Sequence, residues 1–315
     1  MGVTREDLIR SGRYLEISDE EWEKELATRK YVIDCYMAND SWAIKIKKPV
    51  LVLLISHPYG RQFLTASLKT HLKLGYWIAL AYDNYFDPKE PTYDWERWMP
   101  SKDQMEMADS FFMGHWQSWG GVSYPFMWLL RIAAGFALNF EYVYCINGDC
   151  IIEKPEGFPK MLETLGDADI MSSGPALERE IGTAGLLMKS QAFFKIAKHL
   201  VDHVVPFEEY EKSTQDFGNT EGRLAVAVRD LGLKQVIVTP PYNEQFHKPG
   251  VGFWAETIGF RHIHGELNYA YRYKGIPPLP EYIDERFAGA EDVKATKAYW
   301  ETKDMKILEN WWAKE

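Results

Sequence analysis

The stretch KPVLVLLISHPYGRQFLTASLKTHLKLGYWIALAYDN, residues 48–84, decides the fold class. It opens with an apolar run, residues 48–56, that is rich in Val, Ile and Leu and typical of a strand buried on both faces. Residues 61–75 follow with apolar side chains at helical spacing and a terminal glycine. Residues 76–84 form a second strand-like run that ends in an acid, Asp83. A strand, a helix and a strand in this order predict a parallel βαβ unit and an α/β fold.

The same alternation continues along the chain. Hydrophobic patterning predicts further strands at 142–146, 170–174, 183–190 and 234–241, and helices at 18–26, 122–140, 154–169, 191–204, 220–233 and 291–313. Residues 85–120 break the pattern with prolines, acids and clustered aromatic rings. We expect a long, partly helical insertion there. It either lies close to a site or is a surface insertion with a small core of its own. The segment from 242 to the C-terminal helix is expected to be irregular.

Composition limits the classes of function. The chain has 315 residues and a net charge of −10, which disfavours a generally basic nucleic-acid surface but leaves room for a local basic groove. Three cysteines, Cys35, Cys145 and Cys150, form no CxxC pair and favour a reducing compartment. Because the sequence shows neither an apolar signal region nor a run of ~18 apolar residues, we expect a cytoplasmic protein without a membrane anchor.

An acidic turn interrupts the stretch EYVYCINGDCIIEKP, residues 141–155. The strand ends on Asn147, Gly148 and Asp149, and strand-like residues resume at once, so Asp149 is badly placed to cap a helix. Ligands of open α/β sheets bind at the carboxyl ends of the strands. There we expect Asp149, Asp83 and the turn that starts with Ser56 and His57. A carboxylate in this position suits Mg²⁺ or Mn²⁺, or a ribose hydroxyl.

The order of these elements resembles the glycosyltransferases of the GT-A fold, which use nucleotide-sugar donors. VLVLLISHPYGRQFLTASLKTHLKLGYWIALAYDN resembles their nucleotide-binding half, and YVYCINGDCII resembles the strand that carries their DxD motif. The resemblance covers roughly residues 48–265. It implies a Rossmann-type, mixed but mostly parallel sheet flanked by helices, in a single domain. That domain would comprise an N-terminal extension (1–47), a nucleotide-binding half (48–150), an acceptor and metal half (151–270) and a C-terminal tail with a helix (271–315).

The resemblance also implies roles for single residues. Asn147, Gly148 and Asp149 stand where the family has DxD, so the first acid is an amide here. Asp149 would hold the metal and Asn147 the ribose, although the lower charge leaves metal dependence open. Asp83 would contact the nucleoside, with Ser56 and His57 beside it.

The resemblance further implies a histidine ligand from the C-terminal segment, and a leaving diphosphate would also need basic residues. His262 and His264 share a face if their segment is extended, and His264 is preferred because a glycine follows it. His247 is a third choice for the metal. Arg131 would bind the donor phosphates or pair with Asp149, and Arg61 and Lys248 are weaker choices.

The acceptor hydroxyl needs a base if the reaction inverts configuration. Asp216 is preferred, because Glu221 at a helix N-terminus would be a weaker base and also suits a purely structural role. A retaining reaction would need no such base. Trp116, Trp119 and Trp254 could stack on a sugar or a nucleobase, although tryptophans more often serve packing.

The resemblance thus implies a hexosyl- or pentosyltransferase with Mn²⁺ or Mg²⁺ and a nucleoside-diphosphate sugar, foremost a UDP-sugar. The hydroxyl acceptor could be a saccharide, a small molecule, a protein or modified DNA. One alternative is a nucleotidyltransferase, which usually has a glycine-rich basic loop where SHPYGRQ has one glycine. Others are a non-catalytic nucleotide- or carbohydrate-binding protein, and a metal hydrolase that uses His57, Asp83 and Asp149.

Overall fold

The computed structural model describes residues 48–57, 60–83, 99–114, 133–173, 185–202, 220–238, 252–287 and 291–313. The expected helix at 18–26, most of the expected helix at 122–140 and large parts of the expected insertion lie outside these residues. No helix in the described ranges has the length and apolar character needed to cross a lipid bilayer.

A seven-stranded sheet forms the centre of the protein, in the order β3-β2-β1-β4-β7-β6-β8. All of its strands are parallel except β7, which runs antiparallel to both of its neighbours. The sheet is therefore mixed and mostly parallel, and the predicted α/β fold class is confirmed. The strands are β1 (Val50–Ser56), β2 (Trp77–Asp83), β3 (Ser110–Gly114), β4 (Tyr142–Asn147), β6 (Ile170–Ser173), β7 (Gly185–Lys189) and β8 (Gln235–Val238).

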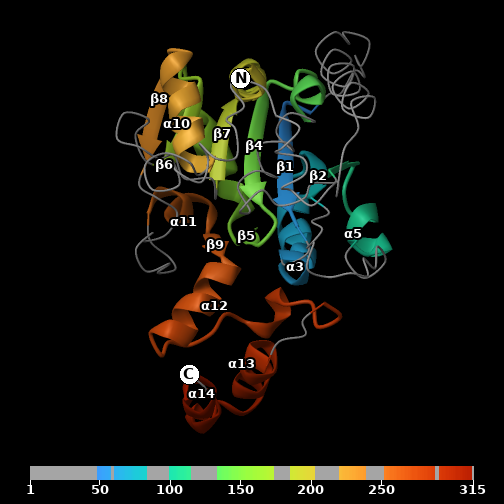
Figure 1. Ribbon diagram of the computed structural model, residues 1–315, viewed down its shortest axis with the longest axis vertical. Coiled ribbons are helices and arrows are strands. Elements are labelled where there is room, and N and C mark those ends of the chain that lie inside the picture. Colours follow the sequence, from blue (N-terminus) through green and yellow to red (C-terminus); the bar gives the residue numbers. More distant parts are fainter. Residues whose placement is uncertain are drawn as a thin grey trace, which may run out of the picture.

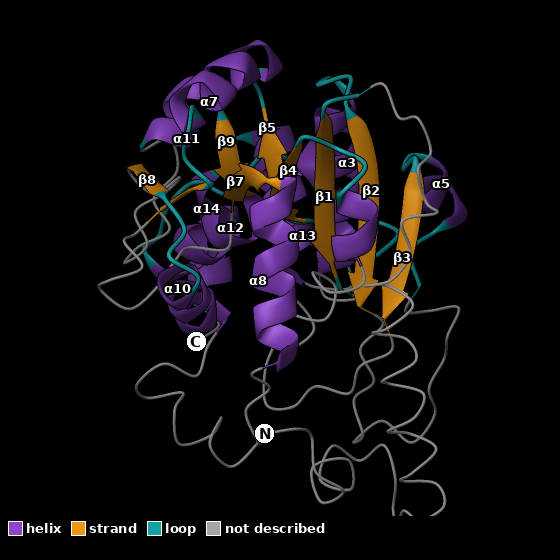
Figure 2. Cartoon of the chain, turned by 90° about the horizontal axis from the view of Figure 1, so that it is seen from above, coloured by secondary structure: helices purple, strands orange, loops and turns teal. Residues whose placement is uncertain are grey.

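Helices cover both faces of this sheet (Figures 1 and 2). Alternate residues of β1 point to opposite faces, as in any strand. Leu51 and Leu53 join the core formed with helical residues 133–137, α8 and α10. Val52 and Leu54 join the core formed with α3, α7 and α11. The helices are α3 (Arg61–Leu72), α7 (Phe158–Leu165), α8 (Ser190–Asp202), α10 (Thr220–Asp230) and α11 (Phe253–Ile258).

The expected insertion contains regular structure in its described part. Residues 99–114 hold the short helix α5 (Lys102–Glu106), capped by Ser101, and then the edge strand β3. The strand pairs in parallel with β2, with Ala79 opposite Ser110. The sequence analysis anticipated helix here but missed this strand, because its short Phe-Phe-Met run follows a charged helix.

A second, two-stranded sheet lies beyond the carboxyl end of β4 (Figure 1). It pairs β5 (Cys150–Ile152) with β9 (Phe260–His262) in antiparallel orientation. The segment from 242 onward was expected to be irregular, and this expectation is wrong for residues 252–272, which form α11, β9 and α12 (Ile263–Arg272). Gly157 lets the chain after β5 touch α11, since a Cβ there would collide with the carbonyl oxygen of Thr257.

The C-terminal residues form two helices in place of the expected single one. α13 (Glu291–Thr302) and α14 (Met305–Trp312) are separated at Lys303, whose φ of 56° is incompatible with a continuous helix. Leu308 and Trp311 of α14 pack with α12 and with Phe63 of α3 in a third core. The C-terminal helices thereby support the small sheet from the side away from the main sheet.

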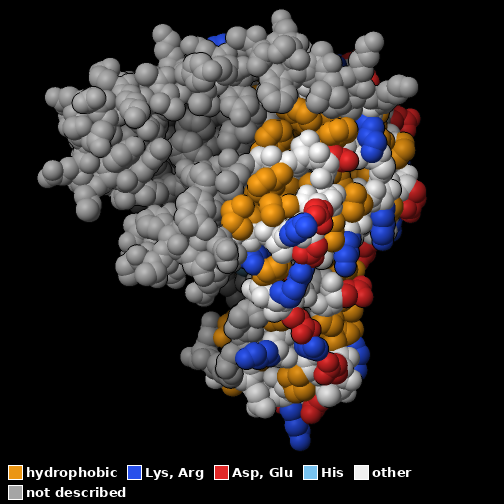
Figure 3. All heavy atoms as spheres, turned by 90° about the vertical axis from the view of Figure 1, so that its right-hand side faces the viewer, with side chains coloured by type: hydrophobic (Ala, Val, Ile, Leu, Met, Phe, Trp, Pro, Cys, Tyr) orange, Lys and Arg blue, Asp and Glu red, His pale blue; other side chains and the backbone are white. Residues whose placement is uncertain are grey.

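Surface charge is mixed on the face shown in Figure 3. There the described Lys and Arg side chains alternate with Asp and Glu, and neither sign forms a continuous stripe.

Candidate functional site

The turn after β4 is docked on the end of β1. The Gly148 N–H donates to the Ile55 carbonyl oxygen at 2.6 Å. A Cβ on Gly148 would lie 2.6 Å from Ser56 Cβ and 2.8 Å from Ser56 Oγ, so the turn can approach β1 this closely only with glycine. The Ser56 hydroxyl is buried and has no hydrogen-bond partner among the described residues. Two strand ends are thus joined at the edge where ligands of α/β sheets bind.

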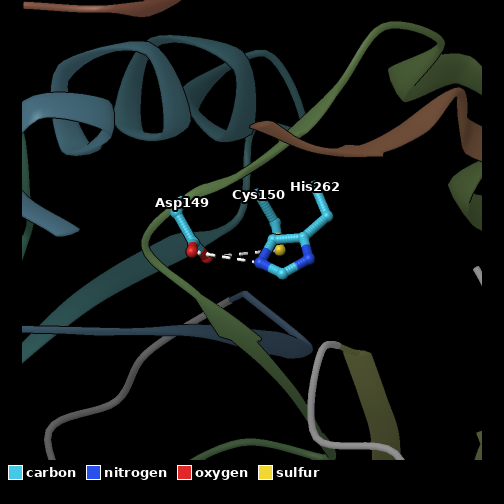
Figure 4. Close-up of side chains that lie close together, drawn as sticks. All are labelled: Asp149, Cys150 and His262. Atoms are coloured by element: carbon cyan, nitrogen blue, oxygen red, sulfur yellow. Dashed lines mark hydrogen bonds and ion pairs between the residues drawn. The ribbon is translucent and has the colours of Figure 1, made fainter. Parts of the chain in front are cut away.

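Asp149 is the centre of the site. It is 9% exposed, and its Oδ2 lies 3.0 Å from His262 Nε2 and 3.7 Å from His264 Nδ1. The His262 side chain is largely buried, whereas that of His264 is half exposed. A carboxylate and two imidazoles from segments far apart in the chain therefore meet at one point. Figure 4 shows His262 pointing toward Asp149.

The charges in this cluster are strongly coupled. Burial raises the pKa of the Asp149 carboxyl, but the charge and hydrogen bond of His262, with those of His264, outweigh burial and hold that pKa well below its usual value. Burial lowers the pKa of His262, yet Asp149 more than compensates and the pKa of this imidazole is raised. The pKa of His57 is lowered, chiefly by burial, with Asp149 opposing and His264 adding to the effect. Asp149 is thus an anion paired with a readily protonated His262.

Neighbouring contacts fix the two histidines. The N–H of Ile263 donates to the Asp149 carbonyl oxygen at 3.0 Å, which joins the start of α12 to the turn. The ring of His264 stacks on Phe63 with centroids 5.7 Å apart. The segment is not extended through both histidines, because His262 ends β9 and His264 lies in the first turn of α12. Both side chains nevertheless reach Asp149, since the chain bends between them.

Cys150 is a site residue that the sequence analysis missed. Its Sγ lies 3.7 Å from Asp149 Oδ1, and the donor atoms of Asp149, Cys150 and His262 all lie within 4.8 Å of one another. Burial raises the pKa of the Cys150 thiol well above its usual value, and Asp149 adds to this shift. The signal was present in the sequence as an acid followed by a thiol, but its meaning depends on pairing with β9.

The donor set decides which cations fit. Mg²⁺ demands oxygen ligands, and Asp149 is its only charged oxygen donor among the described residues of this cluster. Imidazole nitrogen suits Mn²⁺ and other borderline cations, which Asp149, His262 and His264 could hold together. Both expected metals accept a carboxylate such as Asp149, and the two imidazoles favour Mn²⁺ over Mg²⁺.

The other expected site residues are partly described. Asp83 is the last residue of β2 and lies beside the end of β1, with Ser56 opposite Tyr82. Glu221 is the second residue of α10. For Asp83 and Glu221 the structure describes the backbone alone. Arg131, Asp216, His247, Lys248, Trp116 and Trp119 lie outside the described residues.

The structure describes the packing of two further candidates, Trp254 and Arg61. Trp254 is fully buried, and its ring stacks on Tyr144 with centroids 5.9 Å apart, so it belongs to the core and cannot stack on a sugar. Arg61 begins α3, and its guanidinium lies over the ring of Phe287 at 3.7 Å. Arg61 is therefore engaged with the C-terminal segment.

Comparison with known proteins gives weak likenesses of fold. No protein-family model matches the chain, and a search of curated proteins finds no match. Among solved structures, one similar protein is described as a nucleotide-diphospho-sugar transferase from Desulfovibrio desulfuricans. It shares 12% identity over 61% of this chain and 80% of its own, with a TM-score of 0.38. A 4-diphosphocytidyl-2C-methyl-D-erythritol synthase from Anaerococcus prevotii shares 13% identity over 62% of this chain and 90% of its own, also with a TM-score of 0.38. The case for a function therefore depends on the site.

Proposed function

We propose that this protein is a transferase that binds a nucleoside-diphosphate sugar and passes the sugar to a hydroxyl acceptor. One observation carries the proposal: Asp149, in an acidic turn at the carboxyl ends of β1 and β4, is contacted by two imidazoles. This edge is where open α/β sheets bind nucleotides. The family resemblance of the Asn147-Gly148-Asp149 turn supports the same assignment.

The roles of the residues follow from their chemistry. Asn147 would bind the ribose hydroxyls, and Asp83 would contact the nucleoside. Asp149, His262 and His264 would hold a divalent cation such as Mn²⁺, which neutralises negative charge on the diphosphate when bound. UDP is the first choice of nucleotide.

The transfer itself is a substitution at the anomeric carbon of the sugar. The bond from this carbon to the diphosphate oxygen breaks, a bond to the acceptor oxygen forms, and the nucleoside diphosphate leaves. In an inverting reaction the acceptor proton passes to a carboxylate, for which Asp216 is preferred over Glu221. A retaining reaction would leave both acids without this role.

The proposal is tested by thermal unfolding with UDP, GDP, CDP and dTDP, each with and without Mn²⁺. One diphosphate is expected to raise the unfolding temperature, and to raise it further with Mn²⁺. A ligand that binds only the folded state at 100 times its Kd adds about 2.7 kcal/mol to the free energy of unfolding.

A pair of variants makes the test specific. Asp149→Asn should remove the Mn²⁺-dependent part of the shift, whereas Asp167→Asn, the same charge change at an exposed position, should leave it intact. An unchanged Mn²⁺-dependent shift in Asp149→Asn, or no shift with any diphosphate, contradicts the proposal.

Other results would identify the alternatives. Stabilisation by the cation alone, with hydrolysis that needs no acceptor, would indicate a metal hydrolase that uses His57. Turnover of a nucleoside triphosphate with release of pyrophosphate would indicate a nucleotidyltransferase. Donor binding without transfer to any acceptor would indicate a binding protein.

A further inference from the structure

Cys150 lies directly opposite His262 in the antiparallel pair of β5 and β9. Residues directly opposite each other in such a pair project their side chains to the same side, with Cβ atoms about 4.5–5.5 Å apart. The thiol and the imidazole therefore face one space. Asp149 stands in the turn before β5, and its carboxylate bends back into this space, with the Cys150 sulfur 3.7 Å away (Figure 4).

The backbone that carries these donors is tightly held. Asp149 is joined to α12 through the N–H of Ile263, and the N–H of Ile152 lies 3.4 Å from Thr70 Oγ1 of α3. Cys150 is fully buried, and the His262 side chain is 15% exposed. The three donors are consequently preorganised and largely buried, whereas the neighbouring His264 side chain is 47% exposed.

The spacing of the donor atoms suits tetrahedral coordination. Metal bonds of about 2.3 Å to sulfur and about 2.0–2.2 Å to nitrogen and oxygen place neighbouring ligand atoms about 3–4 Å apart. The carboxylate lies at this spacing from both other donors, through a different oxygen for each: 3.0 Å from Asp149 Oδ2 to His262 Nε2 and 3.7 Å from Asp149 Oδ1 to Cys150 Sγ. Small side-chain rotations bring the remaining pair into range, because all three donors lie within 4.8 Å of one another.

We propose that Cys150 is a metal ligand together with Asp149 and His262, and that the site takes a thiophilic cation of the Zn²⁺ or Co²⁺ class in preference to Mg²⁺. Thiolate and imidazole select such cations, whereas Mg²⁺ demands oxygen. Binding replaces the S–H bond of Cys150 with a sulfur–metal bond and the Nε2–H bond of His262 with a nitrogen–metal bond. The thiol proton and the Nε2 proton of the imidazolium both pass to solvent, which leaves His262 as a neutral imidazole protonated on Nδ1. His264, whose Nδ1 lies 3.7 Å from Asp149 Oδ2, is available as a fourth ligand. The inference deepens the proposed metal site, but it does not require sugar transfer.

Cobalt gives a readout that is independent of activity. Metal-free protein is titrated with Co²⁺ alone and followed by absorption spectroscopy. Cobalt bound to a thiolate gives a charge-transfer band in the near ultraviolet, in addition to the visible bands of tetrahedral Co²⁺. We expect both the charge-transfer band and the visible bands. Zn²⁺ should displace the bound Co²⁺, whereas excess Mg²⁺ should not.

The chain provides a matched control cysteine. Cys145 is also buried, but it belongs to the core on the opposite face of the main sheet. Cys150→Ser should abolish the charge-transfer band and weaken Co²⁺ binding by about tenfold or more, while Cys145→Ser should keep both. Circular dichroism of each variant verifies that it is folded.

Two outcomes overturn the inference in different ways. Visible cobalt bands without a charge-transfer band would show a metal site in which Cys150 takes no part, which leaves the proposed function standing. Absence of any cobalt binding would remove the metal site itself. Failure of the sugar-transfer proposal would instead be seen in the diphosphate panel, with the cobalt spectrum unchanged.

Discussion

Arg261 binds Glu266 through both carboxylate oxygens, with 2.9 Å from Nε to Oε1 and 2.6 Å from Nη2 to Oε2. Its third contact runs from Nη1 to Glu153 Oε1 at 2.8 Å. Arg261 precedes His262 and Glu266 follows His264, so this bidentate pair clamps the bend that directs both imidazoles at Asp149. The Glu266 side chain is 6% exposed, which makes the pair stronger than a surface ion pair.

Glu266→Gln should therefore weaken both the fold and the site. It leaves a partly buried Arg261 with one anionic partner, and we expect a loss of about 2–3 kcal/mol in the free energy of unfolding. Co²⁺ affinity should fall by about tenfold as His262 and His264 lose their support. Glu153→Gln is the control, because Glu153 is 41% exposed and its loss should cost about 1 kcal/mol or less. Equal effects of the two changes in urea unfolding would contradict this role.

Gly148→Ala should displace the acidic turn from β1. The added Cβ would collide with Ser56, and such overpacking costs about 1–3 kcal/mol. Nucleotide-dependent and metal-dependent thermal shifts should shrink with it. Gly60→Ala is a matched control beside the same strand end, since its Cβ would meet Ser56 and His57 at 3.5 Å or more. If Gly148→Ala keeps the full nucleotide- and metal-dependent increases in unfolding temperature, the position of the turn on β1 does not matter for binding.

His71 predicts a loss of stability in mild acid. Burial lowers its pKa from 6.5 to about 4, opposed only in part by its hydrogen bond to the Ser67 carbonyl oxygen. The folded protein keeps this ring neutral, whereas the unfolded chain takes up a proton below about pH 6.5. The contribution of His71 is thus fully present above that pH and is lost progressively toward pH 4.

The size of this effect is measurable by urea unfolding. Between about pH 7.5 and about pH 5, His71 should account for about 2 kcal/mol of the decrease in unfolding free energy. His71→Asn keeps a donor for the Ser67 carbonyl oxygen but does not titrate. Between about pH 7.5 and about pH 5, the unfolding free energy of this variant should therefore decrease by about 2 kcal/mol less than that of the natural protein. Parallel pH profiles for the variant and the natural protein would exclude this assignment.

The C-terminal helices should unfold together with the sheet. Leu308 is fully buried in the core that α14 shares with α12 and Phe63, so Leu308→Ala should destabilise the protein by about 2–4 kcal/mol. Met305 is 44% exposed on the same helix, and Met305→Ala should have a much smaller effect. A separate, early unfolding step in Leu308→Ala, with the main transition unmoved, would show that the helices form an independent unit.

Much of the main sheet could be predicted from local patterns. The apolar run at 48–56 is long and uninterrupted because β1 is buried on both faces, and the helical spacing of 61–75 reflects one buried face of α3. The strand order, with β7 antiparallel between β4 and β6, could not be read in this way. Pairing depends on contacts across the fold that leave no periodic signature in the chain.

Most residues of the site could be predicted from the sequence, but the contacts between them could be predicted only in part. Asp149 stood out because an acid interrupts two strand-like runs. His262 and His264 stood out because the resembled family often supplies a histidine ligand from its C-terminal segment. For Cys150 the sequence offered only its position directly after an acid, which does not by itself indicate a ligand. A buried cysteine is usually a small apolar residue, and its different surroundings here follow from its register with His262.

The pairing of β5 with β9 also sets an order of events during biosynthesis. Asp149 and His262 are 113 residues apart in the chain. A ribosome adds about 5–20 residues per second, so Asp149 and Cys150 emerge roughly ten seconds before the histidine that faces them. A nascent chain of that length holds the thiol and the carboxylate without their imidazole partner. Any ion that needs all three can be captured only after translation has passed β9 and the chain has closed this long loop.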